Sequence, residues 1–431
     1  MVSHSYEDME IMITSNKRYA LLILSFYFLA YILPIGALDL FSHDETRYAE
    51  IPREMIATNN WVVPKIDGVR YFEKPAMGYW VHAASILIFG ENNFAVRFPS
   101  ALSVGLTALL IYLMVRRASY RENEDENYRA IISPLIFLSC FGVFEIGNVA
   151  VLDNLFSFFL TASITSFYFA LEESPGSGKE KLFLIISGLA CGFSFLTKGF
   201  LAFAIPVLCL VPYLLWERRY KDLLRMSWLP VLIAVLVALP WSILIHLREP
   251  DFWRFFVWNE HIRRFMAENA QHKKSFWYFF MTAPAMFIPW TFLIPSAVFG
   301  LKSLINNHSL QGRLIRLSFC WLVLPFLFFS ISNGKLITYI LPCFPPFAIL
   351  MYFGLLNILE KGRDKLFRWG VAGNGIFFIL VLFAFTYIQL WGYRDFHLFE
   401  HYWKAILFAS GLIIIISFCF WSIKCLKALI K

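Results

Sequence analysis

The stretch "HDETRYAEIPREM", which begins at His43, crowds ionisable side chains at the end of a long apolar run. If residues 43–51 are helical, Asp44, Arg47 and Tyr48 lie at positions i, i+3 and i+4 and share one face. The alternative is a plain surface ion-pair pattern, which contributes only about 0.3 kcal/mol per pair. The placement favours a functional use, because ionisable groups at the edge of a bilayer usually face a cavity or one another.

Acids, bases and tyrosines recur in five later segments that we expect at the same face of the membrane. These segments are "YFEKPAMGYW" with Tyr71, Glu73 and Lys74, "VAVLDNLF" with Asp153, "FLTKGFLAF" with Lys198, "NEHIRR" with Glu260, His261, Arg263 and Arg264, and "NGKLITYILPCFPP" with Lys335 and Tyr339. Chance explains one or two such segments at one rim. Six segments in all predict a polar cavity on the outer face.

Many cations with a few carboxylates suit a phosphorylated substrate. A sugar on a polyprenyl phosphate already carries a good leaving group, so the protein mainly has to stabilise phosphate charge with Lys and Arg. A carboxylate can stabilise the developing oxocarbenium carbon, and it can act as general base if the acceptor is a hydroxyl. No GxGxxG or P-loop pattern occurs, so the expected donor is a lipid-linked sugar and not a nucleotide sugar.

The composition requires a membrane protein to position these residues. Of 431 residues, 59% are hydrophobic and only 16% are charged, more apolar surface than a soluble protein can bury. Because a span needs roughly 20 apolar residues, we predict an all-α polytopic protein of about twelve spans. The predicted spans are 19–40, 94–115, 130–148, 153–171, 182–197, 199–216, 227–247, 280–301, 314–331, 336–358, 368–391 and 404–423.

The distribution of Lys and Arg predicts the orientation. More than half of the 38 basic residues fall in loops on the side of the amino terminus, which places both termini in the cytoplasm. Residues 1–18 are then a cytoplasmic tail and 19–431 a membrane domain with outer loops 41–93 and 248–279 and no C-terminal soluble domain. The net charge of +8 reflects this bias and anionic lipid heads, without support for a nucleic-acid partner.

The two outer loops predict amphipathic helices that lie flat at the interface. Phe252, Phe255, Phe256 and Ile262 fall near helical spacing with charges between them. The alternative is that such helices only seal the bundle. In the first loop, Pro52 predicts a kink or a new helix start.

The motifs "DETRYAEIPREM", "YFEKPAMGYW", "VLDNLF", "LTKGFLAF", "WNEHIRRF" and "KLITYILPCFPPFAIL" resemble, in this order, the signatures of the bacterial aminoarabinose transferase group. These are GT-C glycosyltransferases related to the protein O-mannosyltransferases, and the resemblance covers roughly residues 40–350. It implies an inverting inner-membrane enzyme with a periplasm-facing site. It also implies an undecaprenyl phosphate-linked donor and a lipid A phosphate acceptor, a modification that confers resistance to cationic peptides such as polymyxin.

The resemblance also implies roles for single residues. Asp44 matches the outer-loop acid, a candidate for catalysis or acceptor orientation, and Asp153 matches the second membrane-edge acid. Lys74 is expected near the donor phosphate. The further candidates for substrate binding are Arg47, Tyr48, Tyr71, Lys198, Arg263, Arg264, Lys335 and Tyr339.

No cofactor is obligatory for this chemistry, but Glu73 and His261 are candidate ligands of a divalent cation. Two ligands do not complete a shell, so water or another carboxylate would have to fill it. The alternative for His261 is an interfacial histidine bonded to neighbouring backbone.

One departure leaves the substrate open. The aminoarabinose transferases continue into a soluble periplasmic domain, whereas this chain stops after "WSIKCLKALIK". The sugar is therefore aminoarabinose, a hexosamine, galacturonate or mannose. Two other functions stay open, namely a protein or envelope-polymer O-glycosyltransferase and a non-catalytic transporter of lipid-linked sugar. Transporters usually show repeated halves and broken helices at the midplane, and no repeat is visible here.

Overall fold

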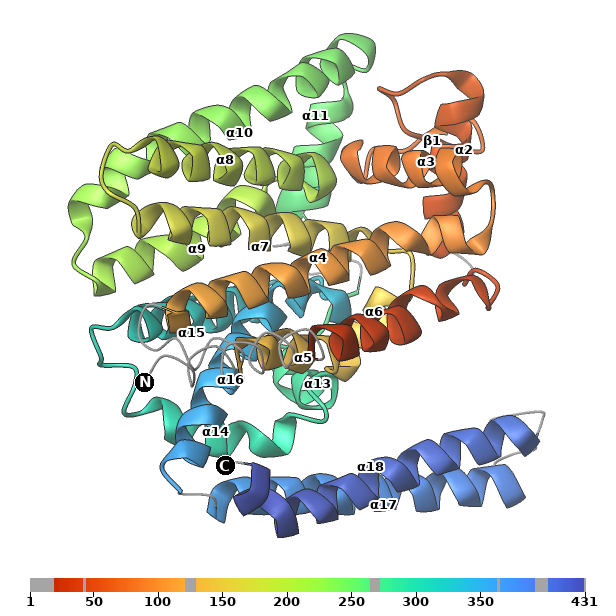
Figure 1. Ribbon diagram of the computed structural model, residues 1–431. Coiled ribbons are helices and arrows are strands. Elements are labelled where there is room, and N and C mark those ends of the chain that lie inside the picture. The colour runs from red at the N-terminus through yellow and green to blue at the C-terminus, as the bar shows by residue number, and fades with distance from the viewer. Residues whose placement is uncertain are drawn as a thin grey trace, which may run out of the picture.

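The computed structural model describes residues 19–41, 44–120, 129–263, 272–362, 365–391 and 402–429. The fold is a bundle of long apolar helices that run side by side, with short elements at the ends (Figure 1). The long elements are the first span Tyr19–Gly36 (which ends in η1, Phe28–Ile32, and η2, Pro34–Gly36), α4 (Asn93–Tyr120), α7 (Leu152–Leu171), α8 (Gly178–Lys198), α9 (Leu201–Trp216), α10 (Tyr220–Arg248), α15 (Leu310–Ile331), η6 (Ile337–Cys343) continuing into α16 (Phe344–Glu360), α17 (Lys365–Trp391) and α18 (Tyr402–Leu429).

The membrane architecture is confirmed, but the count of twelve spans is not. Among the described residues, eight helices are long and apolar enough to cross a membrane, or up to ten if each of two bent pairs is one span. The bent pairs are α5 (Ile132–Leu138) with α6 (Phe141–Gly147), and α13 (Tyr278–Met286) with η5 (Thr291–Leu293) and α14 (Ile294–Leu301). The bends measure 64° and 100°, and hydropathy averaged along the sequence does not register them.

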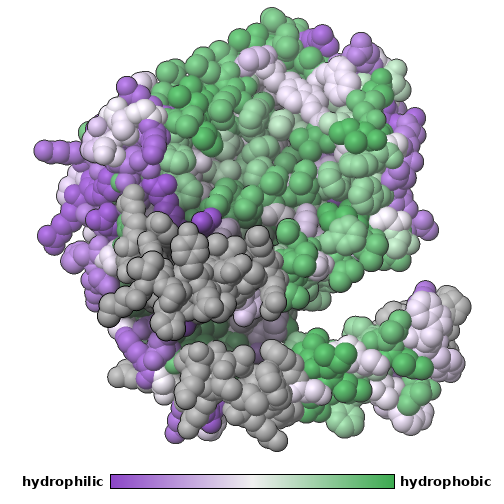
Figure 2. Space-filling view, in the orientation of Figure 1, coloured by the Kyte–Doolittle hydropathy of each residue, from purple (hydrophilic) through white to green (hydrophobic). Residues whose placement is uncertain are grey.

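The surface carries the pattern that a bilayer requires. In Figure 2 a broad hydrophobic surface lies between two edges where hydrophilic residues gather. The central helix is η6–α16, since 89% of the residues in its most apolar segment are buried. In α10 and α17 only 22% of these residues are buried, so both helices present apolar side chains to lipid. Where α14 meets α16, a Cβ at Gly300 would lie 1.9 Å from the carbonyl oxygen of Gly354, so only glycine permits this approach.

The short elements at one end of the bundle carry most of the predicted site. They are α2 (Glu45–Thr58), the hairpin of β1 (Lys65–Ile66) and β2 (Val69–Arg70), α3 (Met77–Phe89), α11 (Phe252–Arg254) and the π-helix η4 (Phe255–Arg263). In Figure 1, α2, α3 and β1 lie together at the upper right. The antiparallel hairpin turns at Asp67 and Gly68, whose φ values of 51° and 75° are those that a tight two-residue turn requires.

The prediction of a helix near 43–51 is confirmed from Glu45 onward, and His43 lies outside the described residues. Of the two alternatives predicted for Pro52, a kink or a new helix start, the new start is wrong. α2 is one helix that contains Pro52 in its interior. Tertiary packing explains why, because Ile51 and Met55 on either side of the proline are buried against Tyr79 of α3. That burial outweighs the lost backbone hydrogen bond.

The helical prediction for the second outer loop is confirmed over 252–263. Phe252 and Phe256 are fully buried, whereas Phe255 and Ile262 stay partly exposed. The ring of Phe252 packs 5.2 Å from that of Phe72. The helix therefore seals the first outer loop and also presents apolar side chains outward, as expected at a membrane interface.

Candidate active site at one rim of the bundle

Tyr48 on α2 is the point where the predicted acids meet. The pKa of its phenol is raised, first by burial and then by the carboxylates of Asp153, Asp44 and Glu73, while Arg47 acts in the opposite direction. Like charges nearby disfavour the ionised phenol, and a nearby cation favours it. The N-terminus of α2, the loop before α3 and the first turn of α7 therefore bring three carboxylates to one side chain.

Arg47 joins α2 to the loop after the hairpin. Its guanidinium donates a 2.8 Å hydrogen bond to the hydroxyl of Tyr71 and lies 3.8 Å from the carboxylate of Glu73. Both partners of this ion pair are about one-third exposed, so the contact contributes little to stability. The group is a partly open cluster with hydrogen-bonding capacity left for a ligand.

Asp153, one of the acids that act on the pKa of Tyr48, forms a second cluster with Lys198. The ammonium of Lys198 lies 2.5 Å from the carboxylate of Asp153, and these side chains are only 8% and 14% exposed. The same ammonium lies 4.5 Å from the centre of the Tyr339 ring, a cation–π distance. Three predicted residues from α7, α8 and η6 thus converge although the sequence separates them widely.

Lys74 reaches across to η4. Its ammonium lies 3.1 Å from the carboxylate of Glu260 and donates to the backbone carbonyl of Glu73 at 2.8 Å. Glu260 of the motif "NEHIRR" is among the charges predicted at this rim, although the sequence assigned it no role. The pair ties the first outer loop to the second and keeps Lys74 at the rim.

Lys335 is placed differently from the prediction. Its side chain is buried, with 2% exposure, and its ammonium donates to the backbone carbonyls of Lys274, at 3.0 Å, and Ser332. Burial lowers the pKa of this ammonium. The predicted role as a cavity-lining cation does not fit this placement, because the ammonium is bonded to these two carbonyls. It thereby joins the loop that contains Lys274 to the loop that contains Ser332.

The remaining predicted positions lie on or beyond η4. Arg263 is an exposed residue at the end of this helix. Arg264 and the side chain of His261 lie outside the described residues, so the cation site at Glu73 and His261 stays a prediction. In the described part of the chain, the one group of three acids with ligand atoms within 4.8 Å of one another consists of Glu50, Glu54 and Asp67.

A buried ion pair that the sequence analysis missed lies beneath the site. Arg97 of α4 donates two hydrogen bonds, of 2.8 and 2.7 Å, to the carboxylate of Glu45 at the start of α2. Both side chains are at most 3% exposed. The available signal was an arginine four residues into a predicted apolar span, a costly position that requires a partner.

The Glu45–Arg97 pair should make the stability of the fold depend on pH in the acidic range. Burial alone would raise the pKa of Glu45, but hydrogen bonds from Arg97, Phe41 and Ala150 outweigh it, so the folded-state pKa lies below the ordinary 4.5. A lowered pKa stabilises the fold fully above about pH 4.5, and this contribution is lost as the pH falls through the folded-state value. We expect the melting temperature in detergent to fall in that acidic window. In Glu45→Gln the fall should be smaller, and an equal fall would exclude Glu45 as its source.

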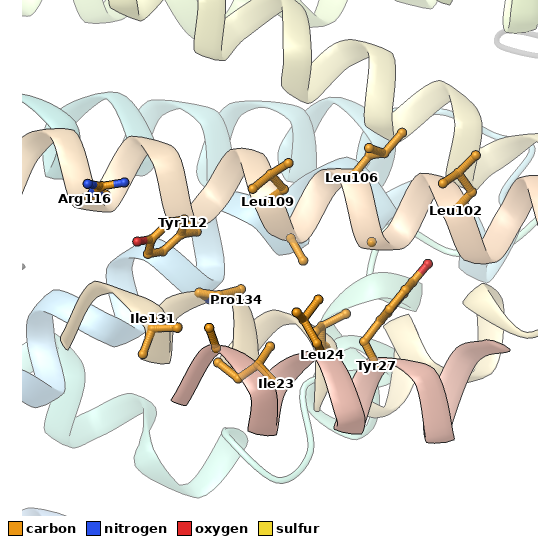
Figure 3. A pocket seen from close by; sticks show the side chains of 14 residues that line it. Ile23, Leu24, Tyr27, Leu102, Leu106, Leu109, Tyr112, Arg116, Ile131 and Pro134 are labelled. Carbon is orange, nitrogen blue, oxygen red and sulfur yellow. The ribbon is translucent and has the colours of Figure 1, made fainter. Parts of the chain in front are cut away.

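A large pocket elsewhere has no acid in its lining. A cavity of about 630 Å³ lies between the first span, α4 and α5, lined almost entirely by apolar side chains with Arg116 at one end (Figure 3). Such a lining suits hydrocarbon and not sugar-transfer chemistry. The ion pairs described above lie outside this pocket.

The chain is similar to known proteins over most of its length. A family model described as dolichyl-phosphate-mannose-protein mannosyltransferase matches residues 16–256. The undecaprenyl phosphate-alpha-4-amino-4-deoxy-L-arabinose arabinosyl transferase of Shewanella sediminis is 43% identical over 370 residues, which cover 86% of this chain and 65% of that protein. The protein of the same name in Serratia proteamaculans is 41% identical over 409 residues, covering 94% of this chain and 70% of the relative.

The fold is shared with a solved structure. ArnT from Cupriavidus metallidurans, crystallised with undecaprenyl phosphate, superposes with a TM-score of 0.80 at 24% identity, covering 95% of this chain and 72% of that one. The chain spans about 65% of the length of the first two curated relatives. The predicted GT-C fold is confirmed, and the chain is a multi-helix membrane protein that belongs to the undecaprenyl phosphate-α-4-amino-4-deoxy-L-arabinose arabinosyl transferase family.

Proposed function

We propose that this protein is an inverting glycosyltransferase that moves aminoarabinose, or a related sugar, from undecaprenyl phosphate to a lipid A phosphate. The observation that carries the proposal is the pairing of carboxylates with cations at one rim, Asp153 with Lys198 and Glu73 with Arg47. Both acids, together with Asp44, also act on the pKa of Tyr48. Carboxylates of this kind stabilise positive charge at a sugar carbon, and the cations stabilise the departing phosphate. The names of the relatives support the choice of donor and sugar.

In this proposal the side chains at the rim and the Asp153–Lys198 pair bind different parts of the substrates. Lys74, at the rim, binds the donor phosphate, and Asp44 faces the reacting carbon or orients the acceptor. The Asp153–Lys198 pair forms the inner wall of the site, where a phosphate oxygen can compete with Asp153 for the ammonium. A phosphate acceptor is already ionised at neutral pH, so no general base is required for it.

Mass analysis of lipid A tests the proposal. Cells that express the wild-type chain should contain lipid A heavier by one aminopentose, whereas cells that express Asp44→Asn should lack this species at equal protein level. Absence of any modified lipid A in cells that make the donor lipid would overturn the acceptor assignment.

The second candidate is transfer to protein or to an envelope polymer, favoured by the mannosyltransferase family model over residues 16–256. In that case lipid A stays unchanged and a glycosylated protein or polymer appears only with the wild type. Transfer between two lipids by the purified protein in detergent, where no second compartment exists, would exclude a pure transporter.

The proposed site faces the periplasm from the inner membrane, an orientation supported by the bias of Lys and Arg toward the opposite loops. A membrane-impermeant thiol reagent checks it on two exposed positions at opposite ends of the bundle. Thr58→Cys on α2 should react in intact cells, and Lys221→Cys at the start of α10 only after the inner membrane is opened. The reverse pattern would place the site in the cytoplasm.

A further inference from the structure

Besides bonding each other, Glu45 and Arg97 form hydrogen bonds with backbone groups of several segments. Besides Arg97, the carboxylate of Glu45 accepts the backbone N–H of Ala150 at 2.7 Å and that of Phe41 at 2.8 Å. The same Glu45 oxygen that receives Ala150 also receives Arg97 Nε. Four hydrogen bonds therefore converge on one buried carboxylate, which fixes its position closely.

Arg97 completes the arrangement on its other side. Its two terminal nitrogens also donate to three backbone carbonyls at the end of the first span, at 2.7 to 2.9 Å. These carbonyls belong to Ile35, Leu38 and Asp39. One guanidinium thus joins α4, the start of α2 and the chain that leads into α2, and its five N–H groups make five hydrogen bonds.

These contacts sit next to both predicted acids. Asp44 immediately precedes Glu45, and Asp153 follows Ala150 by three residues at the first turn of α7. Val151, between them, exchanges hydrogen bonds with the hydroxyl of Ser100 on α4 at 3.2 and 3.3 Å. The carboxylate of Glu45 therefore links the segment that carries Asp44 directly to the segment that carries Asp153.

We propose that Glu45 and Arg97 are positioning residues that set the distance between Asp44 and Asp153 for sugar transfer. The effect on sugar transfer rests on the proposed function, whereas the distance between the two acids is a property of the fold. Both side chains are too buried to touch a substrate, so their effect reaches the reaction only through the backbone that they hold. Misplacement of a reacting group by about 1 Å is enough to cost about 100-fold in rate.

The chain contains a matched control at the opposite end of the bundle. Arg316 of α15 bonds the carboxylate of Glu217, and it also donates to the backbone carbonyls of Ile305 and Asn307. These two side chains are 5% and 9% exposed. The control therefore has the same chemistry and similar burial but lies far along α15 from the rim that carries Tyr339 and Lys335.

The variants must separate positioning from simple stability. Removing one partner leaves a buried unpaired charge and endangers folding, so both are replaced together by apolar residues of similar size, Glu45→Leu with Arg97→Met. A second double variant, Glu45→Gln with Arg97→Met, keeps one carbonyl oxygen able to accept from Ala150. The control is Glu217→Leu with Arg316→Met.

We expect a selective loss of turnover. Per folded enzyme, Glu45→Leu/Arg97→Met should lower kcat at least about 10-fold with the donor KM changed less than about 3-fold, since Lys74 stays in place. The Gln variant should recover several-fold of this loss. The control should lose yield or melting temperature but keep kcat within about 2-fold. Equal kcat losses at both ends of the bundle, or a fully active Leu/Met variant, would overturn the positioning role.

A distance measurement keeps the inference independent of activity. Spin labels at Thr46→Cys on α2 and Asn148→Cys before Ala150 report the separation of the two segments by electron paramagnetic resonance. We expect a narrow distribution with the native pair and with the control variant, and a shifted or broadened one in Glu45→Leu/Arg97→Met. An unchanged distribution would sink the inference. If the wild type transferred no sugar, but the distance still changed in Glu45→Leu/Arg97→Met, only the proposed function would be overturned.

Discussion

Asp44→Asn is expected to lower sugar transfer by about 1,000-fold while the protein remains folded in the membrane. An exposed residue at the start of α2, Asp44 makes no capping hydrogen bond to the helix, so loss of its charge should change the free energy of unfolding by no more than about 0.5 kcal/mol. Its carboxylate nevertheless acts, together with Asp153, on the pKa of the partly buried phenol of Tyr48. A positioned carboxylate that acts on the reacting centre contributes about 100- to 10,000-fold.

The measurement is transfer from undecaprenyl phosphate-linked sugar to lipid A by purified protein, corrected for folded enzyme. Glu50→Gln is the matched control, because Glu50 is an acid on the same helix whose carboxylate pairs with exposed Arg53 at 2.6 Å. It should keep activity within about 2-fold. If Asp44→Asn were fully active, the acid would have no part in the reaction.

Lys74→Ala is expected to lower kcat/KM for the donor by about 100-fold and to leave the dependence on acceptor concentration unchanged. A charge-assisted bond to phosphate contributes about 1.5 to 3 kcal/mol, which corresponds to about 10- to 150-fold. The ammonium is only partly exposed and is held at the rim by the carbonyl of Glu73 and by Glu260. It is therefore positioned before the substrate arrives, which is the condition for a large effect.

Glu260→Gln separates the charge of Lys74 from the linkage between the two outer loops. This change removes the ion pair at 3.1 Å but keeps the ammonium. Donor kcat/KM should then fall less than about 5-fold, since the loops remain packed through the buried rings of Phe252 and Phe72. A loss as large as that of Lys74→Ala would mean that the pair serves loop closure and not phosphate binding. If Lys74→Ala left the dependence on donor unchanged, its role at the donor phosphate would be excluded.

Several features followed from the sequence because they depend on neighbours along the chain. Hydropathy over windows of about 20 residues located the helices, since each must bury its backbone hydrogen bonds in lipid by itself. Charges at the ends of these windows identified the rim. Helical spacing correctly placed α2 and the helix over 252–263. The order of motifs correctly identified the family, although the chain matches only about 65% of the first relatives.

Other features required the folded chain because they depend on distances through space. Lys335 has the same charge as Lys198, yet one donates to loop carbonyls and the other pairs with Asp153. Pro52 stays within a helix because packing against α3 outweighs its local preference. The two bends that reduce the count of straight spans are likewise tertiary events.

What the sequence determined by itself was the solvent of the protein, most of the helices long enough to cross it and the end of the bundle where ionisable side chains gather. Each of these follows from local composition and periodicity. Only the tertiary structure decided which acidic side chain pairs with which basic one. Glu45 pairs with an arginine 52 positions away, and Lys74 with an acid 186 positions away. No periodicity along the chain encodes such a pairing, since its free energy depends on burial and distance after the helices have packed.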